Sequence, residues 1–176
     1  LADGTALRAV AGQPLPPAFR ELAAAGVMAS APEPFDPMEK ALHRLAAEDL
    51  RDGESLPGAG RTLIRSYPLT SGLLAMAQVW AAPTGFAIAA KGAPEAVAGL
   101  CGLTPAQRTA LTTEVELMAR DGLRVLAVAE AAWSGGDLPK AQTGFAFRLL
   151  GLVGLADPLR ASVPAAVAEC RAAGIR

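Results

Sequence analysis

The sequence predicts an α+β fold, in which an antiparallel β-sheet is flanked by helices. Apolar segments with β-branched or aromatic residues recur along the chain, and the first three are joined by turns too short for the crossover that parallel strands need. The expected strands are residues 61–67, 73–80, 85–90, 123–129 and 145–155. Helix-forming segments separate or flank them at residues 18–25, 36–46, 94–98, 104–120 and 163–173. With 176 residues, the chain is long enough for one domain with a substantial core.

Composition excludes several classes of function. The 16 basic and 17 acidic residues leave a net charge of −1 without a basic cluster, so we expect no nucleic-acid partner. No apolar run approaches the roughly 20 residues that span a bilayer, so we expect a soluble segment without membrane contact. Cys101 and Cys170 have neither the spacing of a disulfide framework nor that of a zinc site, which indicates a reducing compartment and no metal site.

Two helix starts carry local signals. Asp36 has the position of an N-cap, Pro37 that of the first helical residue, and Glu39 follows three residues after the cap, as in a capping box. Thr104 and Pro105 repeat the first two signals. Each helix should therefore begin at its proline.

Lys91 and Gly92 follow the expected strand 85–90, and Pro94 suits the first turn of a helix. An ammonium at the mouth of a strand, beside a helix N-terminus, can bind an anion or lie against adenosine. The alternative is a solvated surface charge, because this spacing alone is a weak motif.

Arg124 interrupts the apolar segment 123–129. A guanidinium near a core must be paired or must reach an anion. It either reaches an anion or forms a structural pair with a carboxylate such as Glu95 or Asp121.

Four blocks of the chain, in the same order, resemble the nucleotide-binding domain of P-type cation-transporting ATPases, in the branch of the calcium, magnesium and sodium pumps. The blocks are residues 35–42 (Phe-Asp-Pro-Met-Glu-Lys-Ala-Leu), 91–95 (Lys-Gly-Ala-Pro-Glu), 121–127 (Asp-Gly-Leu-Arg-Val-Leu-Ala) and 151–160 (Gly-Leu-Val-Gly-Leu-Ala-Asp-Pro-Leu-Arg). They extend over most of the chain, which makes the resemblance more specific than any one block.

The resemblance implies a set of nucleotide-binding residues. In it Tyr67 stacks on adenine, although this aromatic side chain could instead cover the core. One departure weakens the expected phosphate binding, because residues 71–74 (Ser-Gly-Leu-Leu) stand where the family usually has an Arg-Lys pair and a Met. The implied set comprises Glu39 at the adenine end, Tyr67, Lys91 with Gly92 lining the pocket, Arg124 at the phosphates, and Asp157 with Arg160 in a hinge.

The resemblance also implies a function for the chain. Residues 1–156 would bind ATP with Mg²⁺, and residues 157–176 would be the hinge and the first helix of the phosphorylation domain. The partners would be the phosphorylation and actuator domains of the same full-length polypeptide, and the segment would be a cytoplasmic part of an integral membrane protein. The γ-phosphate acceptor should be an aspartate in an Asp-Lys-Thr-Gly-Thr sequence, which these 176 residues lack, so we expect binding without turnover.

A second hypothesis keeps the fold but not the nucleotide, so that the domain serves as an interaction or regulatory module. A free-standing kinase or hydrolase is disfavoured, because the sequence has no Walker loop and no nucleophile elbow.

Overall fold

The computed structural model describes residues 5–9, 13–49, 55–156 and 162–175. The helices are α1 (Pro17–Met28), α2 (Pro37–Glu48), α3 (Pro94–Leu100), α4 (Pro105–Arg120) and α5 (Val163–Ala172). The strands are β1 (Leu63–Tyr67), β2 (Ala75–Ala82), β3 (Gly85–Gly92), β4 (Arg124–Trp133) and β5 (Arg148–Leu155), and a short 3₁₀-helix η1 spans Gln142–Gly144. These elements confirm the predicted α+β class.

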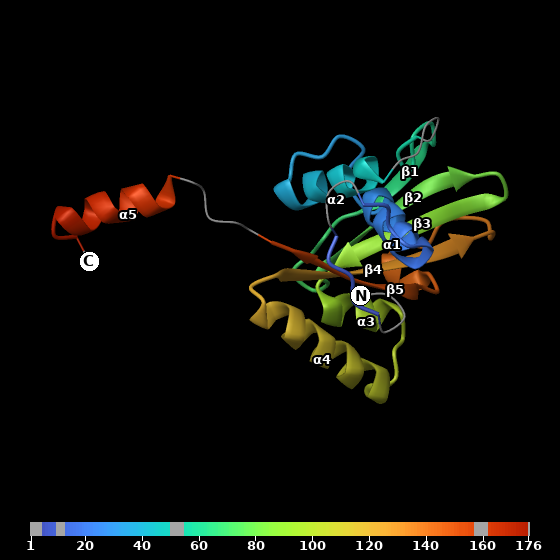
Figure 1. Cartoon of the computed structure of the whole chain (residues 1–176). Helices are drawn as coiled ribbons and strands as arrows, with labels where there is room; N and C mark the ends of the chain where they lie inside the picture. The colour runs from blue at the N-terminus through green and yellow to red at the C-terminus, as the bar shows by residue number, and fades with distance from the viewer. Residues whose placement is uncertain (1–4, 10–12, 50–54, 157–161, 176) are drawn as a thin grey trace.

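The strands form one antiparallel five-stranded sheet in the order β1-β2-β3-β4-β5. Consecutive strands are neighbours throughout, so the predicted meander extends across the whole sheet (Figure 1). Gly85, the first residue of β3, follows the tight turn from β2; it has a φ of 92°, and a Cβ there would lie 2.3 Å from the Trp133 carbonyl oxygen. Only glycine fits this turn without strain.

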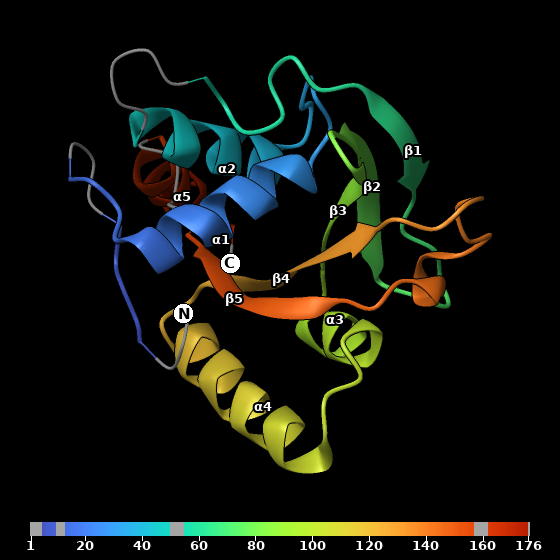
Figure 2. The same ribbon diagram turned by 90° about the vertical axis from the view of Figure 1, so that its right-hand side faces the viewer.

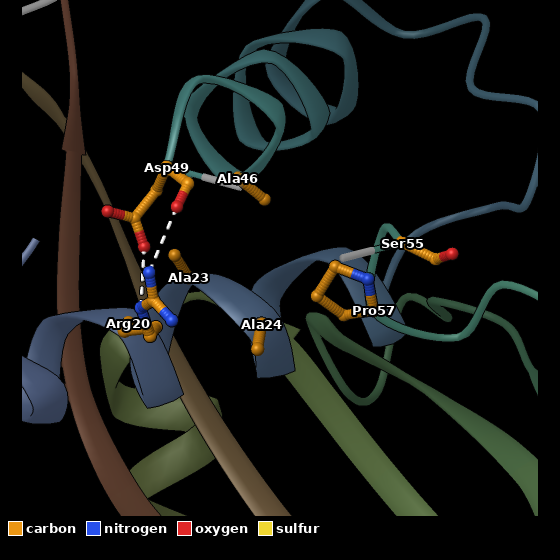
Figure 3. A pocket seen from close by; sticks show the side chains of 7 residues that line it. All are labelled: Arg20, Ala23, Ala24, Ala46, Asp49, Ser55 and Pro57. Carbon is orange, nitrogen blue, oxygen red and sulfur yellow. Dashed lines mark hydrogen bonds and ion pairs between the residues drawn. The ribbon is translucent and has the colours of Figure 1, made fainter. Parts of the chain in front are cut away.

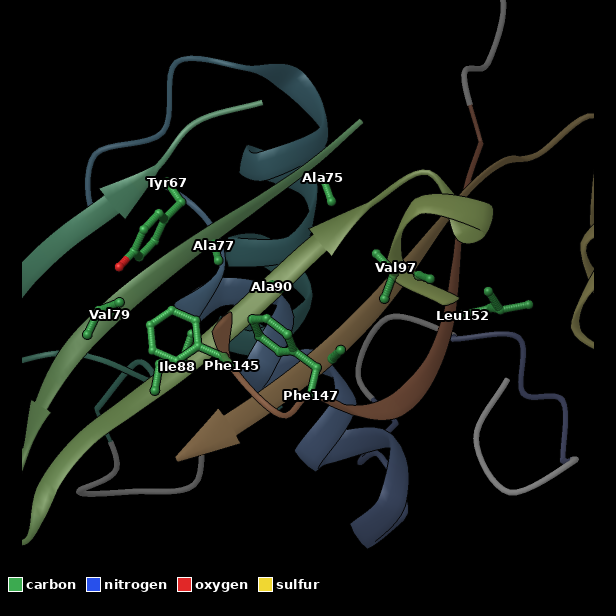
Figure 4. Close-up of a cluster of buried hydrophobic side chains, with 12 residues drawn as sticks. Tyr67, Ala75, Ala77, Val79, Ile88, Ala90, Val97, Phe145, Phe147 and Leu152 are labelled. Atoms are coloured by element: carbon green, nitrogen blue, oxygen red, sulfur yellow. The ribbon is translucent and has the colours of Figure 1, made fainter. Parts of the chain in front are cut away.

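Helices cover both faces of the sheet (Figure 2). Helices α1 and α2 lie on one face, which we call the α1/α2 face, and α3 and α4 lie on the other, the α3/α4 face. The larger apolar cluster fills the α3/α4 face and includes Tyr67, Phe145, Phe147 and Val97 (Figure 4). Apolar side chains are thus removed from water on both sides of the sheet, which is the main stabilising contribution.

The α1/α2 face has a smaller core. Leu22 of α1 packs with Val128 and Leu150 of β4 and β5, and Leu42 of α2 packs with Val27 of α1. Helix α2 therefore reaches the sheet largely through α1, which leaves its first turn near the end of the sheet.

Both predicted helix starts are confirmed. Asp36 caps α2, and its Oδ1 accepts hydrogen bonds from the backbone N–H groups of Met38 (2.8 Å) and Glu39 (3.3 Å). Thr104 caps α4 in a capping box with Gln107. In α2, however, the carboxylate of Glu39 turns to another partner, which is described below.

No helix in the described part of the chain is long and apolar enough to cross a membrane. Helix α5 was predicted from the sequence, and none of its residues is buried.

Candidate functional site

A buried ion pair joins Lys91 of β3 to Glu39 of α2. The ammonium Nζ lies 2.6 Å from Glu39 Oε1, and the two side chains are 7% and 12% exposed. The prediction that Lys91 ends a strand was wrong in one respect, because β3 continues to Gly92 and Lys91 pairs with both Met76 of β2 and Val128 of β4. The ammonium therefore lies beneath the first turn of α2 and not at an open strand end.

Two further groups hold this pair in place. The Lys91 ammonium also donates to the hydroxyl of Ser30 at 2.5 Å, and Glu39 Oε2 accepts from the backbone N–H of Ala31 at 3.3 Å. Ser30 is completely buried. No local pattern in the sequence points to Ser30, because the contact that links its hydroxyl to the site is made by Lys91, 61 positions away along the chain.

Burial shapes the electrostatics here. It lowers the pKa of Lys91, and the hydrogen bond and charge of Glu39, then the charge of Asp36, oppose that shift. His43, one turn after Glu39, also has a lowered pKa, chiefly from burial; the charge of Glu39 opposes this and that of Lys91 adds to it. The Nε2 atom of His43 is buried without a hydrogen-bond partner. Burial thus disfavours the charged forms of both Lys91 and His43, and the Glu39 carboxylate opposes this effect at both residues.

Arg124 lies on the same face of the sheet. Val128 is opposite Lys91, and side chains on one strand alternate between faces, so Arg124 and Val128 point to the α1/α2 face. The Arg124 guanidinium is exposed and lies 3.9 Å from the sulfur of Met38 in the first turn of α2. Among the described residues it forms no ion pair, so Glu95 and Asp121, the two carboxylates named as alternatives, do not pair with it.

Tyr67 does not join this group. It pairs with Ala77, which pairs with Ala90, the residue before Lys91, so Tyr67 and Lys91 point to opposite faces. Its side chain belongs to the α3/α4 core, where the ring packs edge to face against Phe145 with 5.6 Å between centroids (Figure 4).

The Tyr67 hydroxyl donates to the Pro139 carbonyl at 2.6 Å, and the residue is 7% exposed. This corrects the expectation that its ring lines the same pocket as Lys91. The alternative reading, an aromatic side chain that covers the core, describes its position.

Gly92 and the segment after Tyr67 have structural explanations. A Cβ at Gly92 would lie 2.3 Å from the Leu74 carbonyl oxygen, so the close approach of two strands requires glycine. Ser71 and Gly72 form a tight loop closed by mutual backbone hydrogen bonds between Thr70 and Leu73 (3.1 and 3.2 Å). The stretch that lacks the expected basic pair is thus a compact turn. Asp157 and Arg160 lie outside the described residues.

A separate pocket of about 280 Å³ opens between α1 and α2 (Figure 3). Arg20 and Asp49 form an ion pair at 2.8 Å on its wall, and Ala23 and Ala46 line its floor. None of the predicted site residues that the structure describes lines it. The candidate site is therefore the set of Glu39, Lys91 and Arg124 at the N-terminus of α2.

Sequence comparison finds that this chain is similar to part of several cation-transporting ATPases. The chain is 32% identical over 152 residues, 80% of its length, to the sodium/potassium exporting P-type ATPase cta3 of Schizosaccharomyces pombe. It is 33% identical over 152 residues to the probable cation-transporting ATPase F of Mycobacterium tuberculosis. It is 33% identical over 134 residues to the plasma membrane-type calcium-transporting ATPase 1 of Oryza sativa.

The chain spans a small part of these relatives, between 12% and 16% of their lengths. No protein-family model matches it. The comparisons thus agree with the resemblance found in the sequence at the level of cation-transporting ATPases.

Proposed function

We propose that this chain is the nucleotide-binding domain of a P-type cation-transporting ATPase, and that it presents ATP to a phosphorylatable aspartate on another domain of the same polypeptide. One observation carries the proposal: Glu39, Lys91 and Arg124, which lie far apart in the sequence, gather at the N-terminus of α2 on one face of the sheet. The similarity to cation-transporting ATPases over 80% of the chain supports it.

The groups present fit ATP as a ligand. The exposed Arg124 guanidinium has no carboxylate partner among the described residues, and its planar donors suit phosphate oxygens. Lys91 and Glu39 compensate each other's charge, which suits a polar but uncharged group such as a base. The bound ATP supplies the transferable phosphoryl group. The chain's own residues orient it and offset the phosphate charge.

Magnesium would arrive with the nucleotide. The described part of the chain contains no group of three His, Cys, Asp or Glu side chains that could hold an ion. The Mg²⁺ would therefore be bound mainly by the phosphates, as is usual for this ion. Residues 1–156 form the proposed nucleotide-binding unit. Residues 157–176 would lead into the phosphorylation domain, and the actuator domain would be a further partner.

The experiment is an ATP titration of the 176-residue chain, in which calorimetry measures binding and NMR measures the backbone amide shifts. We expect saturable binding with shifts near Lys91 and Arg124. Arg124→Met should weaken binding about tenfold, because a charge-assisted hydrogen bond to phosphate is lost. Arg61→Met is the matched control, since Arg61 is also exposed but precedes β1 at the opposite end of the sheet, and it should leave affinity unchanged.

The second candidate function is an interaction module that has lost the nucleotide. The burial of Tyr67 on the α3/α4 face favours it, because no ring from that residue is available for stacking beside Lys91. Absence of heat and of amide shifts at millimolar ATP would support this candidate and reject the nucleotide-binding one.

A further inference from the structure

The hydroxyl of Ser30 has a fixed direction. Ser30 lies just after α1, and its Oγ donates to the Gly26 carbonyl oxygen at 2.8 Å. A serine hydroxyl has one proton, so with that proton bound to Gly26 it can only accept a further hydrogen bond. The acceptor lone pairs meet the Lys91 ammonium at 2.5 Å.

The Lys91 ammonium has three donors. Ser30 Oγ and Glu39 Oε1 accept from two of them, and the described residues offer the third N–H no acceptor. With Glu39 alone, the ammonium could rotate about its Cε–Nζ bond. A second acceptor fixes that rotation and therefore fixes the direction of the third N–H.

Adjacent residues hold both members of the ion pair. Ser30 binds Lys91 through its side chain, and Ala31 binds Glu39 through its backbone N–H. The segment after α1 therefore sets the position of the pair relative to β3 and to the first turn of α2. Ser30 itself is fully buried, so it acts on a ligand only through Lys91.

We propose that Ser30 is a positioning residue of the candidate nucleotide site, which orients the Lys91 ammonium so that its remaining N–H is directed to a bound ligand. This inference rests on the proposed function. It adds to the site a residue that sequence reasoning did not identify. A lysine held by an ion pair alone has one protein acceptor, whereas Lys91 has two.

The test compares wild type with Ser30→Ala and Ser30→Cys in the 176-residue chain. The alanine removes the acceptor, and the cysteine replaces it by a weak acceptor of similar size, so folding is preserved in at least one variant. The first readout is the ¹H–¹⁵N signal of the lysine ammonium groups without nucleotide. The chain has three lysines, and Lys40 and Lys140 are exposed, so the slowly exchanging signal should belong to Lys91.

We expect this signal in the wild type and its broadening beyond detection in both variants. The second readout is ATP affinity, which should fall about tenfold in both variants, as for a lost hydrogen bond to a charged group. Ser66→Ala is the matched control. It removes a hydroxyl that donates to Gln78 on β2, and it should change neither readout.

The outcomes separate the two proposals. A wild-type chain that does not bind ATP overturns the proposed function and this inference with it. Binding that is equal in wild type and both Ser30 variants overturns the inference alone. A lost ammonium signal with unchanged affinity also overturns it, because Ser30 would then be structural.

Discussion

At the scale of single residues, the buried pair of Lys91 and Glu39 decides what the site can bind. Its ammonium already serves two protein acceptors, and its charge is compensated by the carboxylate. Such a group is a poor clamp for a triphosphate, whereas the exposed Arg124 is free of ion pairs among the described residues. The geometry therefore suits the exposed guanidinium of Arg124 for phosphate and the buried pair for an uncharged polar group.

We predict that Lys91→Met lowers the free energy of unfolding by about 3–5 kcal/mol, because Glu39 is left buried without its counter-charge. Glu39→Gln should also destabilise, because it leaves the ammonium uncompensated. The double variant should lose clearly less than the sum of the two single losses. Urea unfolding of all four proteins measures this cycle, and additive losses would show that the pair is not coupled.

A second prediction concerns Cys101. Burial raises the pKa of the Cys101 thiol to about 11, so at pH 8 very little of it is thiolate, the form that reacts. Cys170 is exposed. In the native chain at pH 8, iodoacetamide should therefore modify Cys170 first and Cys101 slowly, with the Cys101 rate rising towards pH 11.

Peptide mass spectrometry over a time course follows both sites, and Cys170→Ser removes any competition. The protein unfolded in urea serves as the control, since both thiols should then react at similar rates. Equal rates in the native protein at pH 8 would contradict the effect of burial on Cys101.

The residue scale also shows where sequence reasoning fails. Glu39 and Lys91 come together, and Arg124 lies beside Met38. That these residues bind nucleotide, as the family resemblance implies, stays a prediction. Tyr67 does not join them, because in a strand the face of a side chain changes with every residue and so depends on register. The register of β1 shifts between Leu63 and Arg65, a feature that no local pattern in the sequence encodes.

At the scale of elements, local sequence signals predicted the helix starts correctly, but they did not predict how far a strand continues through pairing with its neighbours. Asp36 and Thr104 cap their helices as predicted, because a cap needs only its own side chain and the next few backbone N–H groups. The end of β3 was missed by two residues, since Lys91 and Gly92 continue the strand through bonds to β2 and β4. Such bonds come from chain segments that a local window does not contain.

Gly92 gives a prediction at this scale. Gly92→Ala should destabilise the domain by about 1–3 kcal/mol, as in overpacking, because its Cβ would lie 2.3 Å from the Leu74 carbonyl oxygen and would separate β2 from β3. Gly99→Ala is the matched control. Gly99 lies in α3 with open space around it, so alanine there should be neutral or stabilise by up to about 1 kcal/mol.

Thermal unfolding and the amide shifts of β2 and β3 measure the effect. If Gly92→Ala is as stable as Gly99→Ala, the two strands can separate at no cost, and the close approach does not explain the glycine.

At the scale of the whole molecule, the α+β class could be predicted, and so could the antiparallel pairing of β1, β2 and β3, because short turns join these three strands. What could not be predicted is which helices cover which face, since that depends on packing across the sheet. The division has a consequence for function. The α1/α2 face holds Glu39, Lys91 and Arg124, and the α3/α4 face holds the aromatic core.

The tail gives the last prediction. None of the residues of α5 is buried, whereas Leu150 and Leu152 of β5 are buried and β5 pairs with β4 from Arg148 to Leu155. Deleting residues 157–176 should therefore shift the thermal midpoint by no more than about 1–2 °C and leave ATP affinity unchanged, as for changes at an exposed surface.

Deleting residues 148–176 is the matched control. It removes β5 as well, which exposes the edge of β4 and the apolar groups on both faces, so no cooperative unfolding transition should remain. If deleting residues 157–176 caused a large loss of stability, the tail would belong to the folded unit. The domain boundary proposed after residue 156 would then be wrong.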